Sequence, residues 1–445
     1  MSDDGRPDDA SYEAIQSVGG KPGGVPEPKS LARIAVYFAN FGLSKAVAYL
    51  APLVLAAYLD SSSYGVVEYA WSWSILVATL LTLGIPAAIP QLSLLRRPVP
   101  VSDIVTLCVA GPGALLTVAA VIAMAVAGSP AQAVVFSACT IALAQVTLSS
   151  YSRTFSHRNL ALWFEGLSIY GMTVVALGLA LTGLTGFLPL GILSTFVATL
   201  FLITALILFA RLKQAEFMVR LQSAVRIGLP LLAFTLSSIW AAVSGRVYIG
   251  AFFPIEDLSV YSVDFRIASA MLIVHSIVGT GLFARLYNMP TRLYDRFLSL
   301  YLVALAILAL LMVLVFPTIL AHIGFRSIGH EQIPVAIRLF PIVALQVYAW
   351  GAWASLEVRL ARARRSGPAA WKAIVLIAAI AILVAGLGIT GLLTLRLCAW
   401  LMALQMLGGV AIQLYTLWRR GMKMRLSAIA FALTSLMIGL SFQFV

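Results

Sequence analysis

Thirteen apolar segments, each close to the length of a membrane-spanning helix, constrain this chain more than any other feature. About 20 consecutive apolar residues are needed for a helix to cross the hydrocarbon of a bilayer. Hydrophobic residues make up 61% of the chain and charged residues 11%, whereas a soluble domain is about half apolar and a quarter charged. The sequence therefore predicts an all-α polytopic membrane protein with 12–13 transmembrane helices. The segments cover 34–59, 66–94, 103–127, 131–151, 160–183, 187–210, 226–253, 258–286, 297–320, 334–360, 370–390, 396–418 and 426–444.

The basic residues are concentrated on one side of this predicted bundle. The N-terminal tail and every second connection hold most of the 30 Lys and Arg residues, whereas the intervening turns hold only Arg326 and Arg396. Cytoplasmic loops of membrane proteins collect Lys and Arg, so we expect a cytoplasmic N-terminus. Thirteen crossings would then leave Val445 outside.

Enzyme and cofactor signatures are missing from the sequence. The chain has no Gly-x-x-x-x-Gly-Lys-Ser/Thr run, no His-Glu-x-x-His and no Cys/His cluster, which are the patterns of phosphate-binding loops and metal sites. Its three cysteines lie far apart in apolar runs, and the connections on the outer side are short. We expect no catalytic site, no metal and no cofactor. The net charge of +13 is explained by the loop asymmetry, so no nucleic-acid partner is implied.

An internal repeat divides the chain. Ala56–Tyr69 aligns with Gly250–Val263, with small, aromatic and apolar positions in step. Six helices separate the two stretches, so the halves have the same orientation and are related by a pseudo-two-fold axis along the membrane normal. We expect a disordered cytoplasmic tail (1–30), a first lobe (31–210), a basic amphipathic linker on the inner leaflet (211–226), a second lobe (227–418) and an extra C-terminal segment (419–445).

Short motifs in both halves resemble one transporter family. They are Leu53–Tyr58, Tyr64-Gly65-Val66, Leu83-Gly84-Ile85-Pro86, Gly228-Leu-Pro230 and Ser244–Phe252. With the length and the two-lobe order, they resemble the polysaccharide exporter (oligosaccharide flippase) branch of the multidrug/oligosaccharidyl-lipid/polysaccharide flippase superfamily. The resemblance implies two six-helix lobes around a central cavity that opens alternately to each side of the bacterial inner membrane. A thirteenth segment departs from the even number usual in that family.

Four charged residues lie deep inside apolar segments, where an Arg costs about 3 kcal/mol unless it is paired or faces water. Arg246 and Asp264 each lie nine residues from a turn at about Ile255, so we expect them to form an ion pair. This pair either only locks the hairpin or belongs to the substrate site, with Arg246 or Arg266 left as a spare cation that faces a cavity and holds an anion. Lys45 has no acid within a turn of it, and Arg266 lies on a serine-rich face of its helix, opposite the face that carries Asp264. We expect these two to hold an anion, one from each lobe, although Lys45 could instead pair with a distant acid.

Three further residues are candidates for substrate contact, each with a structural alternative. His275 is either a hydrogen-bonded interior histidine or a proton relay. Arg338 lies one turn inside its segment and either lines the cavity or extends to the outer interface. Trp350 either packs in the core or forms a platform for sugar rings.

Together these features favour a flippase that moves an anionic polyprenyl-pyrophosphate-linked oligosaccharide for cell-surface polysaccharide biosynthesis. Its partners would be the lipid-linked glycan, membrane lipids and the polymerase or glycosyltransferase machinery. Arg suits phosphate because its planar fork donates two hydrogen bonds at once. A cation-coupled multidrug exporter of the same fold is the alternative. A membrane glycan polymerase or ligase is less favoured because no outer loop is large enough for a catalytic domain.

Overall fold

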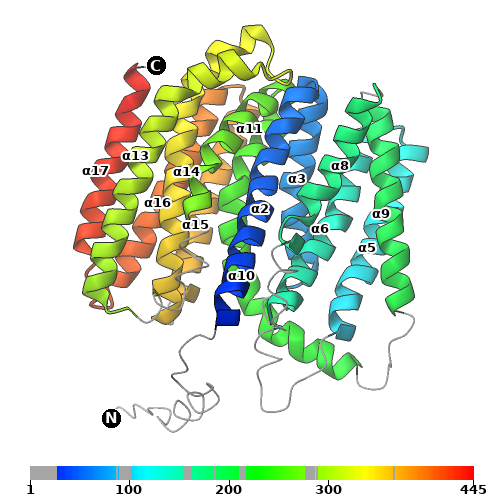
Figure 1. The fold of residues 1–445 in the computed structure, drawn as a ribbon, viewed down its shortest axis with the longest axis horizontal. Helices are drawn as coiled ribbons and strands as arrows, with labels where there is room; N and C mark the ends of the chain where they lie inside the picture. Colours follow the sequence, from blue (N-terminus) through cyan, green and yellow to red (C-terminus); the bar gives the residue numbers. More distant parts are fainter. Residues whose placement is uncertain are drawn as a thin grey trace.

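The chain folds into a bundle of long helices, shown in Figure 1. The computed structural model describes residues 28–86, 89, 102–154, 163–183, 187–209, 217–275, 286, 289–363 and 366–444. The predicted tail therefore lies almost wholly outside the described residues. Thirteen helices of 15 residues or more lie within them: α2 (Pro28–Tyr58), α3 (Ser61–Leu81), α5 (Ser102–Ala125), α6 (Pro130–Thr154), α8 (Leu167–Leu181), α9 (Phe187–Phe209), α10 (Phe217–Phe252), α11 (Ile255–Ser269), α13 (Thr291–Ile323), α14 (Ile333–Arg362), α15 (Ser366–Ile389), α16 (Leu395–Trp418) and α17 (Arg425–Ser441).

The predicted all-α membrane fold is confirmed. Within the described residues, seven helices are long and apolar enough to cross a membrane, and several others, α17 among them, are apolar but shorter. Large apolar side chains such as Ile192, Leu314 and Ile389 are more than half exposed. Such surfaces are stable against lipid and unfavourable against water.

Two lobes stand side by side in Figure 1, with α2 to α9 in one and α10 to α17 in the other. In the first lobe, α6 packs against α3, α5, α8 and α9. In the second, α14 is the central helix and packs against α11, α13, α16 and α17. The lobes meet where α3 packs against α10 and α11, and where α2 packs against α11.

The predicted repeat is confirmed by where the helices end. In that alignment Tyr58 matches Phe252, and Ser61 matches Ile255; α2 and α10 end at the first pair, and α3 and α11 begin at the second. Each lobe therefore has a tight turn at the same point. In the first lobe, Asp60 caps α3 by accepting hydrogen bonds from the Ser63 amide (3.0 Å) and the Ser62 hydroxyl (2.5 Å). Burial opposes ionisation of Asp60, but these hydrogen bonds outweigh it and hold its pKa below the ordinary value.

The predicted linker is not a separate element from residue 217 onward. Residues 217–226 form the first turns of α10, which runs without interruption to Phe252, and these turns lie across the lower edge of the bundle in Figure 1. No helix-breaking residue stands between Phe217 and Arg226, and Gly228 and Pro230 just beyond the expected boundary do not end the helix. Ala224 packs with Ile85 and Ile89 of the first lobe.

Two of the family-like motifs contact each other across the lobes. Leu83 and Gly84, at the end of α3, have φ values of 51° and 72°, and the Gly84 backbone lies against the Gly228 carbonyl of α10. A Cβ on either glycine would overlap the other's backbone. The close approach of two main chains explains why both positions are glycine.

We expect Gly84→Ala to destabilise the protein by roughly 2–4 kcal/mol, from the left-handed backbone and the overlap with Gly228. Thermal unfolding of the detergent-purified protein measures this. Gly42→Ala is the matched control, because a Cβ at Gly42 meets no atom within 4 Å. Equal melting temperatures for Gly84→Ala and the wild type would contradict the predicted effect.

The thirteenth segment forms a helix, α17, that packs along α13 and α14. Asp295 of α13 satisfies the start of α17 by accepting hydrogen bonds from the amides of Leu426 (3.2 Å) and Ser427 (2.8 Å) and from the Ser427 hydroxyl (2.6 Å). In Figure 1, α2 begins at the lower edge and α17 ends at the upper edge. The ends of the described helices thus lie on opposite faces, as thirteen crossings require. Which face is cytoplasmic, and the position of Val445, stay predictions.

Asp295→Ala should loosen the start of α17 by about 1–3 kcal/mol, because two helix-terminal amides, that of Ser427 buried, lose their acceptor. Hydrogen–deuterium exchange in nanodiscs should show faster exchange confined to α17. Ser299→Ala on the same helix is the control, since that hydroxyl bonds only the backbone of its own helix. An unchanged exchange rate in α17 would show that Asp295 does not hold it.

Candidate functional site: a charge cluster between the lobes

A buried carboxylate of the first lobe binds two arginines of the second lobe. We call Glu68, Arg246 and Arg266 the charge cluster. Glu68 Oε1 accepts from Arg266 Nε at 2.8 Å, and Oε2 accepts from Arg266 Nη2 at 3.1 Å and Arg246 Nη1 at 2.9 Å. Tyr64, one turn before Glu68 on α3, donates its hydroxyl to Oε1 at 3.0 Å. The cluster therefore crosses the interface between the lobes.

Aromatic rings hold both guanidinium groups in place. Arg246 lies 4.7 Å from the Phe265 ring centroid, and Arg266 lies 5.0 Å from that of Trp71. The side chain of Glu68 is 0% exposed, and those of the two arginines are 8% and 12% exposed. Cation–π contacts of this kind strengthen when the cation is removed from water. The cluster carries two positive charges and one negative, so one positive charge is left over inside the protein.

The predicted pair of Arg246 with Asp264 is wrong. Arg246 bonds Glu68, and neither carboxyl oxygen of the fully buried Asp264 has a hydrogen-bond donor within reach in the described part of the chain. Equal depth does not determine direction around a helix axis. Asp264 and Arg266 are two residues apart and so point about 200° apart around α11, and α11 turns Arg266 toward α3.

Lys45 and Arg266 both have an acidic partner, contrary to the expectation that they lack one. Glu68 pairs with Arg266, and Lys45 Nζ lies 2.7 Å from Glu165 Oε2. Glu165 comes just before α8 and 120 residues after Lys45, so sequence proximity could not reveal it. The alternative of a distant acid is therefore correct for Lys45. The only sequence signal was an isolated acid at the start of an apolar segment.

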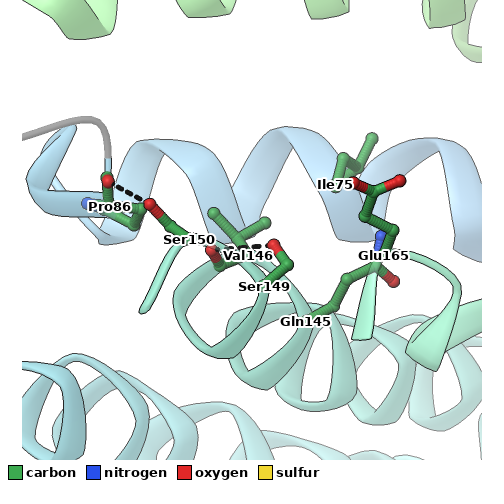
Figure 2. A pocket seen from close by; sticks show the side chains of 7 residues that line it. All are labelled: Ile75, Pro86, Gln145, Val146, Ser149, Ser150 and Glu165. Atoms are coloured by element: carbon green, nitrogen blue, oxygen red, sulfur yellow. Dashed lines mark hydrogen bonds between the residues drawn. The ribbon is translucent and has the colours of Figure 1, made fainter. Parts of the chain in front are cut away.

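Glu165 also lines a cavity within the first lobe, shown in Figure 2. The cavity holds about 270 Å³ and lies between α3, α6 and the turn that precedes α8. Its polar groups come from Gln145, Ser149, Ser150 and Glu165, and Ser150 donates a hydrogen bond to the Pro86 carbonyl oxygen. This cavity is inside one lobe, whereas the resemblance implied a cavity between the lobes.

The other predicted site residues lie apart from the cluster or support it indirectly. His275 Nδ1 lies 3.0 Å from the Tyr301 hydroxyl and 3.3 Å from the Ser355 hydroxyl, which fits a hydrogen-bonded interior histidine. Arg338 is exposed near the start of α14. Trp350 stacks on Phe265 with centroids 6.1 Å apart, so it packs behind the ring that contacts Arg246.

Glu68 is the member of the charge cluster that sequence reasoning missed. It was visible as an acid in the third turn after the Asp60 cap. Two unpaired arginines in the matching hairpin of the other lobe were the signal that an acid was needed. What the sequence did not show is that α3 packs against both helices of that hairpin.

Comparison with solved structures identifies the fold of this chain. The sequence matches no protein-family model and no curated protein. Among solved structures, it is similar to the lipid II flippase MurJ in an inward closed conformation, with a TM-score of 0.65 and 10% identity over 92% of this chain and 98% of that one. It is also similar to the eukaryotic MATE transporter AtDTX14, with a TM-score of 0.45 and 14% identity over 92% and 98%. The first likeness shows that this chain has the two-lobe fold of the MurJ structure.

Proposed function

From the fold of a lipid II flippase and the arginine pair between its lobes, we propose that this chain is a flippase of the same superfamily. Its substrate would be an anionic polyprenyl-pyrophosphate-linked oligosaccharide, moved across the bacterial inner membrane for cell-surface polysaccharide biosynthesis. The observation that carries the proposal is the convergence of Arg246 and Arg266 on one acceptor at the lobe interface.

The physical argument rests on the cost of moving phosphate through hydrocarbon. An isolated ion in a low-dielectric medium costs tens of kcal/mol by Born solvation. Two guanidinium groups, each able to bond two phosphate oxygens, replace the lost hydration. They also remain charged throughout, because arginine does not lose its proton in proteins. The lipid tail would stay in the bilayer while the two lobes open alternately.

Lys45 is assigned a secondary role in this proposal. It comes from α2, which packs against α11, the helix that carries Arg266. Its side chain is 18% exposed and its ammonium group is bonded to Glu165, so it reaches a second phosphate only after leaving that acid. Asp264, His275, Arg338 and Trp350 are not assigned to substrate.

Export of cationic small molecules is the second candidate, favoured by the Glu165 cavity. A carboxylate facing a largely apolar cavity with a few polar groups is a suitable group for a protonated amine. Lys45, however, neutralises that carboxylate at 2.7 Å. A cationic ligand would have to displace Lys45, which makes this candidate weaker than the flippase.

The test uses the full chain in proteoliposomes that contain a fluorescent polyprenyl-pyrophosphate oligosaccharide in both leaflets. Accessibility of the label to a membrane-impermeant quencher reports translocation. We expect the protein to move the labelled lipid between leaflets, and empty liposomes to show none. Failure to move it, together with uptake of a lipophilic amine such as ethidium, would overturn the flippase and support the exporter.

A further inference from the structure

The anion site of the proposed function is already occupied by a group from the protein itself. We propose that Glu68 is a built-in counter-ion, that a phosphate group displaces it from Arg246 and Arg266, and that this exchange separates α3 from α10 and α11. The inference rests on the proposed function for its substrate, but it concerns how the site is regulated.

The donors around Glu68 fill the acceptor sites of its carboxylate and leave one donor over. Three guanidinium N–H groups and one hydroxyl point at its two oxygens. Arg246 Nε is buried beside them and has no acceptor in the described part of the chain. A buried donor without an acceptor is uncommon in folded proteins. A phosphate group has more acceptor oxygens and offers a partner for this nitrogen.

The net charge of the cluster also favours replacement of Glu68 by a phosphate group. The cluster carries one uncompensated positive charge, because two arginines face one carboxylate. A pyrophosphate group that is esterified at both ends carries two negative charges and neutralises both arginines, which Glu68 does not. Glu68 would keep its hydrogen bond from Tyr64, since both residues belong to α3.

The packing around the cluster couples this exchange to movement. Glu68 is fully buried, Gly65 lies against the Ile255 carbonyl, and Ser259 donates to the Ser61 carbonyl oxygen. Backbone-to-backbone contact of α3 with α11 leaves no room for a group larger than a carboxylate. A phosphate therefore enters only as these helices part, so anion binding and opening at this end are one event.

The experiment measures the distance between the lobes in the full-length protein with inorganic pyrophosphate as the probe. Spin labels are placed at Thr182 and Leu392, two exposed positions that follow α8 and α15 at the same end of the bundle as the α10–α11 turn. The three native cysteines, Cys108, Cys139 and Cys398, are replaced by alanine. Pulsed electron-spin resonance gives the distance, and calorimetric titration gives the affinity for pyrophosphate.

We expect pyrophosphate to lengthen the distance in the wild type in a saturable way. Glu68→Gln should lengthen it without ligand and should bind pyrophosphate at least about tenfold more tightly, because the competing charge is gone. A variant with Arg246→Leu and Arg266→Leu should not respond. Glu357→Gln is the matched control, since this acid bonds Ser238 and Trp353 within the second lobe, and it should behave as the wild type.

Three results would overturn the proposal: no binding of pyrophosphate to wild type or Glu68→Gln, equal affinity in both, or binding without a change in distance. If Glu68→Gln does not fold, the proposal is tested by the pyrophosphate titration of the wild type and by the variant with Arg246→Leu and Arg266→Leu. Pyrophosphate-driven opening in a protein that moves no lipid-linked oligosaccharide would refute the proposed substrate and leave the displacement of Glu68 standing.

Discussion

Replacing Glu68 with leucine is expected to destabilise the protein by about 3–5 kcal/mol, the usual cost of leaving buried charges without their partner. Arg246 and Arg266 would then repel each other between the lobes, and each would lose its hydrogen bonds to Glu68. The same reasoning predicts rescue when all three charges are removed together. A triple variant with leucine at the three positions should regain most of the lost stability, because a neutral interface has no unpaired charge.

Thermal unfolding in detergent and the amount of protein in the membrane measure both variants. Ser72→Ala is the control for mutation on α3, since the Ser72 hydroxyl bonds only the Glu68 carbonyl oxygen of its own helix. A triple variant no more stable than Glu68→Leu would show that the cluster does not account for the loss.

Transport should be abolished in the stable triple variant. Without Arg246 and Arg266 no fixed cation is left in the cluster to replace water around a phosphate, so we expect translocation to fall at least about a hundredfold. The measurement is movement of the labelled lipid-linked oligosaccharide in proteoliposomes, compared at equal protein content. This separates the effect on function from the effect on folding, which single substitutions cannot do.

Arg266→Lys tests the geometry as well as the charge. Arg266 bonds both oxygens of Glu68 through Nε and Nη2, and a lysine ammonium cannot reproduce that planar fork. We expect transport intermediate between that of the wild type and the triple variant. Wild-type transport from the triple variant would refute a role for the arginines in binding substrate.

The extent of the helices could be predicted from the sequence because it depends on local physics. Long apolar runs, the Asp60 cap and Pro254 determine where α2 and α10 end and where α3 and α11 begin. The repeat placed both turns at matching residues, and those matches are the observed helix ends. The exception, the start of α10, arose because the basic amphipathic stretch and the apolar stretch form one helix even though Gly228 and Pro230 follow the expected boundary.

The depth of each charge was also a local property, since it follows from the rise per residue along a helix. That depth indicated that Arg246, Arg266 and Lys45 must each be paired or face water, and the structure pairs all three with acids. The acidic partner of each cation is not a local property. It depends on how far each helix is rotated about its axis and on which helices pack together, and the sequence of one segment determines neither the rotation nor the packing.

Glu68 and Glu165 are the residues that show this difference. Each pairs with a cation more than 100 residues away in the sequence, and each pairing exists only because helices from distant parts of the chain pack together. The sequence determined that this protein spans a membrane as two repeated helical lobes with basic residues in its interior. The tertiary structure decided that Glu68 stands between the two arginines and that Asp264, at the expected depth, faces away from them.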